Sequence, residues 1–416
     1  MVATSTKRRE TEALMHSLSR SGHLSRHPSR NPNRTASYNP YASKQRGVAL
    51  LMVLLVVALV SVMAVTLSGR LQTTVLRTAN FQQAEQAYWY WLSAEEIVRE
   101  LLQRELSESD GVAHQQQMWF QQSESGNIYP VDGGAIQGGI QDLHSCFNLN
   151  SLREGGGPGS EPGSAPPSSD AEEGGGPGSG PGSAPLSSQR ERRKAQLRML
   201  LISVSEDIEP YTADVIVDSL ADWLDQDDNI DGNYGAESVD YQSLLFPHGA
   251  ANSWLTHTSE LRLIRGVTAK IFNDVKDYVC VIPRDNSLKI NVNTVSKEQP
   301  ELLYAVTLGA LGEDEAKEFL NTRRSDGYES LDDARNNGAL SSAASQGPVP
   351  NFGGGIIPEG VTAETIGGAL DDLDVKSKYF QLNAKIGYGD LVIAAQSQFL
   401  ITQEEAKVLF RANAAP

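Results

Sequence analysis

The sequence predicts an α+β fold in which one long N-terminal helix precedes a region of mixed helices and strands. Three observations predict it. An uncharged apolar run at 48–67 continues to residue 106 in a helical pattern without a proline. Amphipathic stretches of helical period fill much of 191–336. Alternating apolar and polar residues, typical of strands, occur at 146–152 and near the C-terminus.

Charge is distributed unevenly along the 416 residues, which as a soft prior make about two to three domains. The chain has 35 Lys and Arg against 52 Asp and Glu, a net charge of −17. Residues 1–47 carry a net charge of +7, which leaves −24 for residues 48–416. This acidic balance excludes a generic nucleic-acid binder, because attraction to phosphate requires positive surface.

The run from Val48 to Leu67 is long enough to cross a membrane. Its 20 residues contain no charge, and a helix of that length is about 30 Å long, the thickness of a bilayer's hydrocarbon core. Lys44 and Arg46 precede it, so the positive-inside rule places residues 1–47 in the cytoplasm and the acidic remainder in the periplasm. The run leads directly into more helical sequence instead of ending in a small-x-small cleavage site, so we expect the anchor to be retained.

Short strands and a low-complexity repeat follow the helix. Within 107–153, turn signals stand at Pro130 and at two Gly-Gly pairs (133–134 and 138–139), and 146–152 is expected to be a strand. In the segment 154–190, GGGPGSEPGSAPPSS recurs as GGGPGSGPGSAPLSS with 13 of 15 positions identical. It has no residues to build a core, so we interpret it as a flexible inserted loop.

A first helical domain is expected at 191–278. Its clearest helix has one apolar stripe, made by Ala213, Ile216, Val217, Leu220, Trp223 and Leu224. An acidic loop at 225–241 ends that helix. The stretch 259–278 predicts one or two short helices interrupted at Gly266.

Extended pieces and a second helical region make up 279–345, and strands make up 346–416. We expect short strands at 279–283 and 289–294, and two helices within 298–336 joined by Leu308-Gly-Ala-Leu-Gly312. The C-terminal part alternates as strands at 378–382, 384–386 and 391–394.

The residues before the apolar run resemble the leader of type IV prepilins and of type II secretion pseudopilins. Lys44-Gln45-Arg46-Gly47 stands directly before that run, and in these families a prepilin peptidase cuts after the glycine, here between Gly47 and Val48. Most members carry glutamate at the fifth mature position, which is Met52 here. The absence of this glutamate is typical of the K-type minor pseudopilins of type II secretion systems, which this sequence therefore resembles. A plain single-pass anchor is the alternative.

The resemblance extends over most of the mature chain through motifs whose order is specific. These are FNLNSL at 147–152, DWLDQD at 222–227 with GAE at 235–237, SELRLIRG at 259–266, VIP and INVNT within 281–294, and SKYF at 377–380. The resemblance implies a pilin-like long helix with a small antiparallel sheet. It also implies a large helical domain of SAM-like or helix-hairpin-helix-like type inserted into that sheet.

The same resemblance implies a structural role. Such a protein is anchored in the inner membrane, processed by prepilin peptidase, methylated, and assembled at the tip of the periplasmic pseudopilus with other minor pseudopilins to support export of folded proteins. The rival hypothesis is a membrane-anchored DNA receptor, because 308–324 resembles a helix-hairpin-helix element. Glu313, Asp314 and Glu315 flank that element, so its charge opposes phosphate binding and no nucleic-acid partner is expected.

The acidic loop is the strongest candidate for a binding site. Carboxylates so close together repel unless a cation or solvent screens them, and hard oxygen ligands suit calcium. Six of them fall within 16 residues: Asp225, Asp227, Asp228, Asp231, Glu237 and Asp240. The run from Asp227 to Gly232 matches the first half of an EF-hand loop, but Ser238 stands where the closing glutamate is required. An EF-hand is therefore not expected.

The family resemblance implies a structural calcium site in this loop. By the D-x-D and GAE pattern of the family, the expected ligands are Asp225, Asp227, Glu237 and Asp240, with Asp228 and Asp231 as second choices. A solvated acidic turn without a metal is the alternative.

The cysteines and histidines provide no candidate for a zinc site or a catalytic site. Cys146 and Cys280 lie on expected strands, and they form either one disulfide in an oxidising compartment or two buried thiols. The seven histidines show no spacing typical of zinc, and no Ser or Cys pairs with one in a catalytic motif. We therefore expect no enzyme.

Overall fold

The computed structural model describes residues 48–154, 186–336, 338–341 and 369–413. The chain divides into two compact units, Met1–Thr73 and Thr74–Pro416, and helix α1 (Val48–Glu108) contains the division point. In the first unit the described residues are all helical, and their apolar side chains are exposed. Among the described helices, α1 is the one long and apolar enough to cross a membrane, with a mean hydropathy of 3.2 over its most apolar window.

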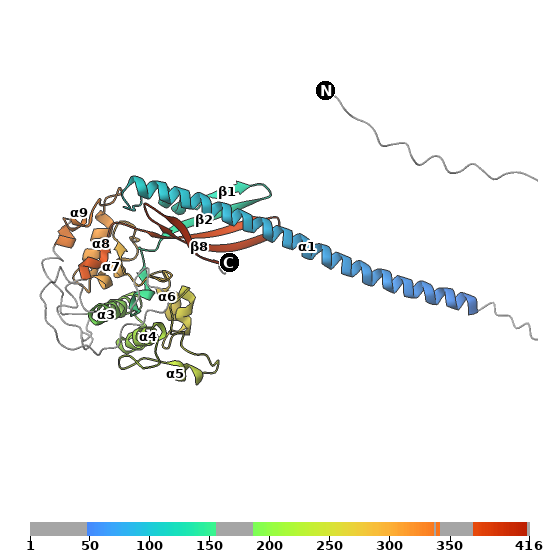
Figure 1. Ribbon diagram of the computed structural model, residues 1–416, viewed down its shortest axis with the longest axis horizontal. Coiled ribbons are helices and arrows are strands. Elements are labelled where there is room, and N and C mark those ends of the chain that lie inside the picture. The colour runs from blue at the N-terminus through green and yellow to red at the C-terminus, as the bar shows by residue number, and fades with distance from the viewer. Residues whose placement is uncertain (1–47, 155–185, 337, 342–368, 414–416) are drawn as a thin grey trace, which may run out of the picture. The chain divides into compact units, whose positions relative to one another are not determined.

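The second unit contains a five-stranded antiparallel sheet of order β1-β2-β7-β8-β9 (Figure 1). An N-terminal hairpin supplies two neighbouring strands and the C-terminal part of the chain supplies three. The strands are β1 (Ile128–Val131), β2 (Gly134–Asp142), β7 (Tyr379–Tyr388), β8 (Leu391–Ile401) and β9 (Ala406–Asn413). Since β2 pairs with β7 from Gly134↔Tyr388 to Asp142↔Phe380, everything between them in sequence is an insertion into the sheet.

The C-terminal half of α1 packs on one face of this sheet through an apolar core. Trp91 and Leu102 are buried there with Phe380 and Phe399, and each such side chain contributes roughly 2–3 kcal/mol by leaving water. A buried polar group fixes the helix to the sheet: Glu95 accepts hydrogen bonds at 2.8–2.9 Å from the guanidinium of Arg411 on β9 and a further one from Ser397 on β8. The indole N–H of Trp91 donates to the same Ser397 hydroxyl at 2.7 Å. These contacts fix which face of α1 meets the sheet.

The insertion is mainly helical and has its own core. Helix α2 (Met118–Glu124) precedes the sheet, and the inserted helices are η1 (Leu149–Leu152), α3 (Leu186–Val204), α4 (Pro210–Leu224), α5 (Ser238–Gln242), η2 (Thr258–Leu263), α6 (Ala269–Val275), α7 (Pro300–Val306), α8 (Glu313–Thr322), α9 (Leu331–Arg335) and η3 (Ala369–Asp372). Two short parallel pairs connect the helices: β3 (Phe147–Asn148) with β4 (Val279–Cys280), and β5 (Ile290–Asn291) with β6 (Leu373–Asp374).

The predicted α+β class with a helical domain inserted into an antiparallel sheet is confirmed. The long helix is present, and all six residues of the apolar stripe at 213–224 are buried in α4. Gly266 separates η2 from α6 with a φ of 88°, a left-handed conformation that favours glycine.

Several predicted boundaries were wrong. The expected strand at 146–152 extends over two residues only, because the Asn148 side chain accepts the backbone N–H groups of Asn150 and Ile282 and turns the chain into η1. The segments 378–382 and 384–386 form one strand, β7, and β9 was not predicted. Gly138 and Gly139 lie inside β2 instead of forming a turn.

The low-complexity segment 154–190 lies mostly outside the described residues. Its end was set too late, because α3 begins at Leu186, within the second copy of the repeat. The last five residues of the predicted insert therefore belong to the helix that opens the helical domain.

Candidate metal centre

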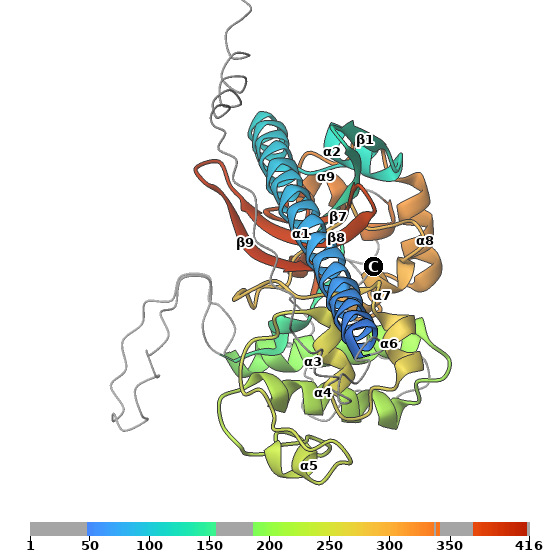
Figure 2. The same ribbon diagram turned by 90° about the vertical axis from the view of Figure 1, so that its right-hand side faces the viewer.

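Three carboxylates from two helices converge at the C-terminal end of α4. Asp222 lies in the last turn of α4, and Asp225 caps that helix. Glu237 is the N-cap of α5, which lies beside α4 in both views (Figures 1 and 2). One ligand oxygen from each residue lies within 4.8 Å of the other two. The three side chains can therefore contact one cation.

The loop between α4 and α5 closes tightly around Asp222. The backbone N–H of Asp231 donates to Asp222 Oδ1 at 2.8 Å. At Gly235 an added Cβ would lie 2.0 Å from Asp222 Oδ2, and Gly232 has a φ of 72°. Glycine at 235 lets the backbone approach the Asp222 carboxylate, and glycine at 232 does the same for Asp218, whose Oδ2 would lie 2.5 Å from an added Cβ.

Four carboxylate oxygens of this cluster are buried and have no hydrogen-bond partner in the described part of the chain. They are Asp222 Oδ2, Asp225 Oδ1 and both Glu237 oxygens. Asp222 is fully buried and the Glu237 residue is 3% exposed. Buried polar groups are nearly always paired, since leaving one unpaired costs about 1–3 kcal/mol. Unpaired anionic oxygens that converge on one point fit a hard divalent cation, for which carboxylates are the preferred ligands.

Burial also disfavours the charged form of each carboxylate. It raises the pKa of Asp222 and of Asp225 to about 6 and that of Glu237 to about 7. Repulsion between the three adds to this shift in pKa. Arg190 on α3 opposes the shift at Asp225, whose Oδ2 lies 3.3 Å from the guanidinium. Arg190 therefore reaches Asp225 Oδ2, while Oδ1 of the same carboxylate has no hydrogen-bond partner among the described residues.

These raised pKa values predict a pH dependence of stability. Because the folded cluster binds protons more tightly than the unfolded chain, its contribution to the free energy of unfolding should decrease as pH rises from about 4 to about 7. The measurement is urea unfolding, without divalent cations, of the protein and of a double variant with Asp222→Asn and Glu237→Gln. As pH rises from about 4 to about 7, the free energy of unfolding of the wild type should fall relative to that of the double variant. A difference between the two proteins that stays constant across this window would contradict the prediction.

The structure brings together two of the four predicted ligands, Asp225 and Glu237. Asp227 is exposed and its Oδ1 accepts the backbone N–H and the side-chain N–H of Asn229 at 2.9 and 2.7 Å. Asp240 accepts the backbone N–H of Glu237 at 3.1 Å and so caps α5. Both carboxylates thus serve the local backbone.

The second choices are also held by other groups. Asp228 accepts from the Asn252 amide at 3.0 Å, and Asp231 pairs with Arg190 at 3.0 Å. Asp222 was missed because it lies within the apolar helix instead of the acidic loop. Its signal in the sequence is a carboxylate three residues before Asp225, on the neighbouring turn of the same helix.

Cys146 and Cys280 form a disulfide with a Cα to Cα distance of 5.7 Å. The bond lies where β3 pairs with β4, in a small apolar cluster with Leu143, Ile282 and Tyr379. It joins residues 134 positions apart and so closes the chain around the first helical region, including the carboxylate cluster.

The helical hairpin α7–α8 presents acidic residues where phosphate binding would need cations. Its second helix begins with three carboxylates in the first turn. Arg323 is buried and donates to the carbonyls of Val292 and Val295, and Arg324 pairs with Asp326 and Asp333. Both arginines that follow the hairpin are therefore occupied, and its geometry supports packing instead of DNA binding.

The predicted processing site lies at the edge of the described residues. Gly47 is outside them, and Val48 is the first residue of α1.

Comparisons with known proteins agree on one family. Two sequence profiles described as Type II secretion system (T2SS), protein K, match residues 145–284 and 290–351. The type II secretion system protein K of Aeromonas hydrophila is 33% identical over 372 residues, which are 89% of this chain and 98% of that protein. The protein of the same name from Pectobacterium carotovorum is 30% identical over 89% of this chain and 96% of its own length.

A solved structure shares the fold. A chain of the GspK–GspI–GspJ complex from the type 2 secretion system of enterotoxigenic Escherichia coli aligns with a TM-score of 0.61 and 24% sequence identity. The match covers 82% of the present chain and 100% of that chain.

Proposed function

The chain belongs to the type II secretion system protein K family, and we propose that it works as a minor pseudopilin that caps the tip of a periplasmic pseudopilus during the export of folded proteins. The observation that carries this proposal is the 33% identity to the Aeromonas protein over 98% of that protein's length. Because the match covers 89% of this chain, it is not confined to one widespread module.

The insertion gives a steric reason for a terminal position. The whole segment from Leu143 to Lys378 is added between two neighbouring strands of the sheet. A subunit with so large an addition leaves little room for another subunit to stack above it. The tip is the one place in a filament where nothing needs to follow.

The proposed partners are the other minor pseudopilins. The related Escherichia coli protein was solved in a complex with GspI and GspJ. Copurification of the tagged full chain with its own minor pseudopilins tests the proposal. Recovery of the chain alone, under conditions where those subunits associate with one another, would count against a tip complex.

A structural role is proposed in place of catalysis. The described residues supply a sheet, a helical cap, a disulfide and a carboxylate cluster, and each is accounted for by packing or cation binding. Calcium is the proposed ion, held by Asp222, Asp225 and Glu237, with Asp222 replacing Asp227 and Asp240 in the ligand set. When bound, calcium would neutralise buried charge and fasten α4 to α5.

The anchor and its processing give a direct prediction. We propose that the apolar part of α1 spans the inner membrane once, with the bulk of the chain in the periplasm, and that prepilin peptidase removes residues 1–47. N-terminal sequencing of the protein from cells with active peptidase should begin at Val48. Gly47→Val should abolish cleavage because the peptidase of this family cuts after glycine, whereas Arg46→Lys should leave it intact. Any other mature N-terminus would contradict this prediction.

A further inference from the structure

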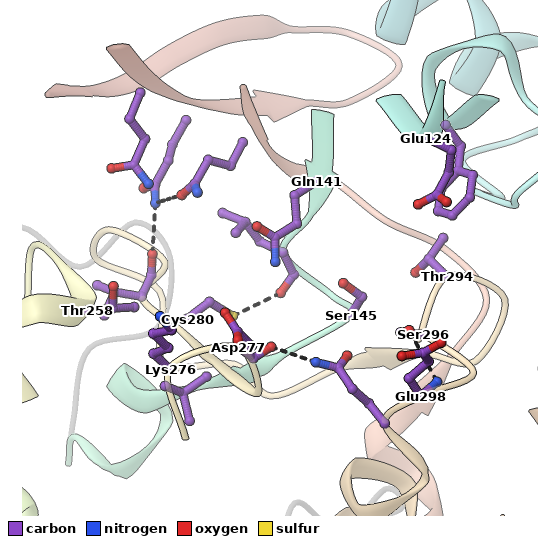
Figure 3. Close-up of a pocket in the computed structure, with 18 of the residues that line it drawn as sticks. Glu124, Gln141, Ser145, Thr258, Lys276, Asp277, Cys280, Thr294, Ser296 and Glu298 are labelled. Atoms are coloured by element: carbon purple, nitrogen blue, oxygen red, sulfur yellow. Dashed lines mark hydrogen bonds between the residues drawn. The ribbon is translucent and has the colours of Figure 1, made fainter. Parts of the chain in front are cut away.

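A cavity of about 660 Å³ lies between the helical insertion and the sheet face opposite α1 (Figure 3). Phe380 and Phe399 pack toward α1, so the residues next to them on β7 and β8 face the other way. On that face Gln141 pairs with Gln381 across β2 and β7, and Gln381 pairs with Gln398 across β7 and β8. Three glutamines therefore stand side by side on three strands, and we call them the glutamine row.

The glutamine row keeps unused hydrogen-bonding groups at the cavity. Gln398 Nε2 donates to Gln381 Oε1 at 2.9 Å and to the Val281 carbonyl at 3.2 Å. Its own Oε1 is buried and has no partner among the described residues, and the whole residue is 4% exposed. The Gln141 amide points into the cavity in Figure 3 and makes no hydrogen bond to other described residues. Gln381 is already satisfied, since its Nε2 donates to Asn383 Oδ1 at 3.1 Å, so the groups left for a ligand or for water are Gln398 Oε1 and the Gln141 amide.

The charges around the cavity nearly balance and lie outside the glutamine row. The charged lining residues are Lys276 and Lys297 on the positive side and Glu124, Asp277 and Glu298 on the negative side. None of the three glutamines can be ionised, so a molecule bound against the glutamine row would meet uncharged amides. Strongly anionic or cationic ligands would gain little there, and a lipid would leave the buried amides unpaired.

The chemistry of the remaining lining groups matches a sugar. Hydroxyls of Ser145 and Thr258 and the ring of Phe120 also line the cavity. A carboxamide offers donors and an acceptor together, and a sugar hydroxyl needs both. An aromatic ring can cover the apolar C–H face of a pyranose. We propose that this cavity binds a neutral oligosaccharide, an inference that does not rest on the role of the chain in secretion.

A peptide fits the arrangement less well. Extended peptides usually bind by adding a strand to an exposed sheet edge. Of the strands that carry the glutamine row, β7 is paired on both sides from Phe380 to Tyr388. β1 covers β2 only from Gly134 to Gln137, and beyond it the Ile140 N–H donates to the Ser123 hydroxyl at 2.7 Å, so a strand added there would have to displace that contact. The cavity is therefore open to a sheet face, where amide side chains supply the contacts instead of backbone.

Calorimetric titration of the full chain tests the proposal. The protein should be held in lipid nanodiscs and prepared without glycoside detergents, since a maltoside would compete. The saccharide probes are chitotetraose (four N-acetylglucosamine units), cellotetraose (β-linked glucose) and maltotetraose (α-linked glucose), each at millimolar concentration. Tetraglycine is the peptide probe. At least one saccharide should bind, and Gln141→Ala should weaken it by about tenfold because a sugar hydroxyl loses its partner.

A matched control separates binding from folding. Gln137 stands on the same face of β2 four residues away, is exposed, and does not line the cavity. Gln137→Ala should leave the affinity unchanged, and both variants should keep the wild-type melting temperature. The proposal is overturned if no saccharide binds, if binding is indifferent to Gln141→Ala, or if tetraglycine binds more tightly than every saccharide.

Discussion

Calcium should stabilise the folded protein by about 3 kcal/mol when its free concentration exceeds the dissociation constant a hundredfold. The reason is the group of unpaired carboxylate oxygens from Asp222, Asp225 and Glu237, which converge in a buried position. The unfolded chain cannot hold them together, so an ion that binds them binds the native state alone. The measurement is thermal or urea unfolding of the full chain with calcium and with a chelator.

Two variants should be destabilising in the presence of calcium but neutral or stabilising in its absence. Asp222→Asn and Glu237→Gln each remove one buried negative charge. Without calcium they should leave stability unchanged or raise it, since repulsion falls and an ionised carboxylate is no longer held away from water. With calcium they should be less stable than the wild type, because a ligand is lost.

Asp227→Asn is the matched control for this experiment. Asp227 belongs to the same acidic loop but is exposed and accepts hydrogen bonds from Asn229. Its replacement should preserve the stabilisation by calcium. Calcium should stabilise the double variant with Asp222→Asn and Glu237→Gln less than it stabilises the wild type. Equal stabilisation of the two would contradict calcium binding by these three carboxylates. Loss of protection in Asp227→Asn would return that residue to the ligand set.

The features that the sequence predicted well are those set by long periodic patterns. The apolar stripe of α4 repeats over four turns, and the uncharged run of α1 continues without a proline, so burial and helix formation follow from local sequence. The strand β9 escaped prediction because its burial alternates only weakly and its place depends on pairing with β8. Likewise, the shortness of β3 depends on Asn148 contacting Ile282, which is distant in the chain.

The carboxylate cluster that we propose as a calcium site shows the same limit of prediction from sequence. Asp225 and Glu237 could be found in the sequence because they belong to a dense acidic loop. Asp222 could not be separated from a solvent-facing helical position until the fold showed Gly235 packed against it. Conversely, Asp227 and Asp240 belong to the same acidic loop as Asp225 and Glu237, but they accept hydrogen bonds from Asn229 and from the backbone N–H of Glu237 and lie outside the cluster of three carboxylates. Spacing identifies the loop, whereas hydrogen bonds decide which of its carboxylates are left for an ion.

Loss of the disulfide should strongly destabilise the folded protein. The bond between Cys146 and Cys280 links residues 134 positions apart, and constraining so long a loop in the unfolded chain contributes about 5 kcal/mol in the chain-entropy account. Replacing both cysteines by alanine should lower the free energy of unfolding by at least that amount. Chemical denaturation monitored by tryptophan fluorescence measures it, because Trp223 and Trp254 belong to the region that the bond encloses.

Reduced wild-type protein is the control that separates the covalent bond from packing. Its two thiols still fill the space between Leu143, Ile282 and Tyr379, whereas alanines leave a small cavity there. We therefore expect reduction to account for most of the loss and the alanine variant to add about 1 kcal/mol more. The parallel pair β3–β4 and the hydrogen bond from Phe147 N–H to the Tyr278 carbonyl at 2.8 Å remain in both, so the native fold should persist. Equal stability of oxidised and reduced protein would mean that strand pairing alone holds the two segments together, and that the bond adds nothing to the fold.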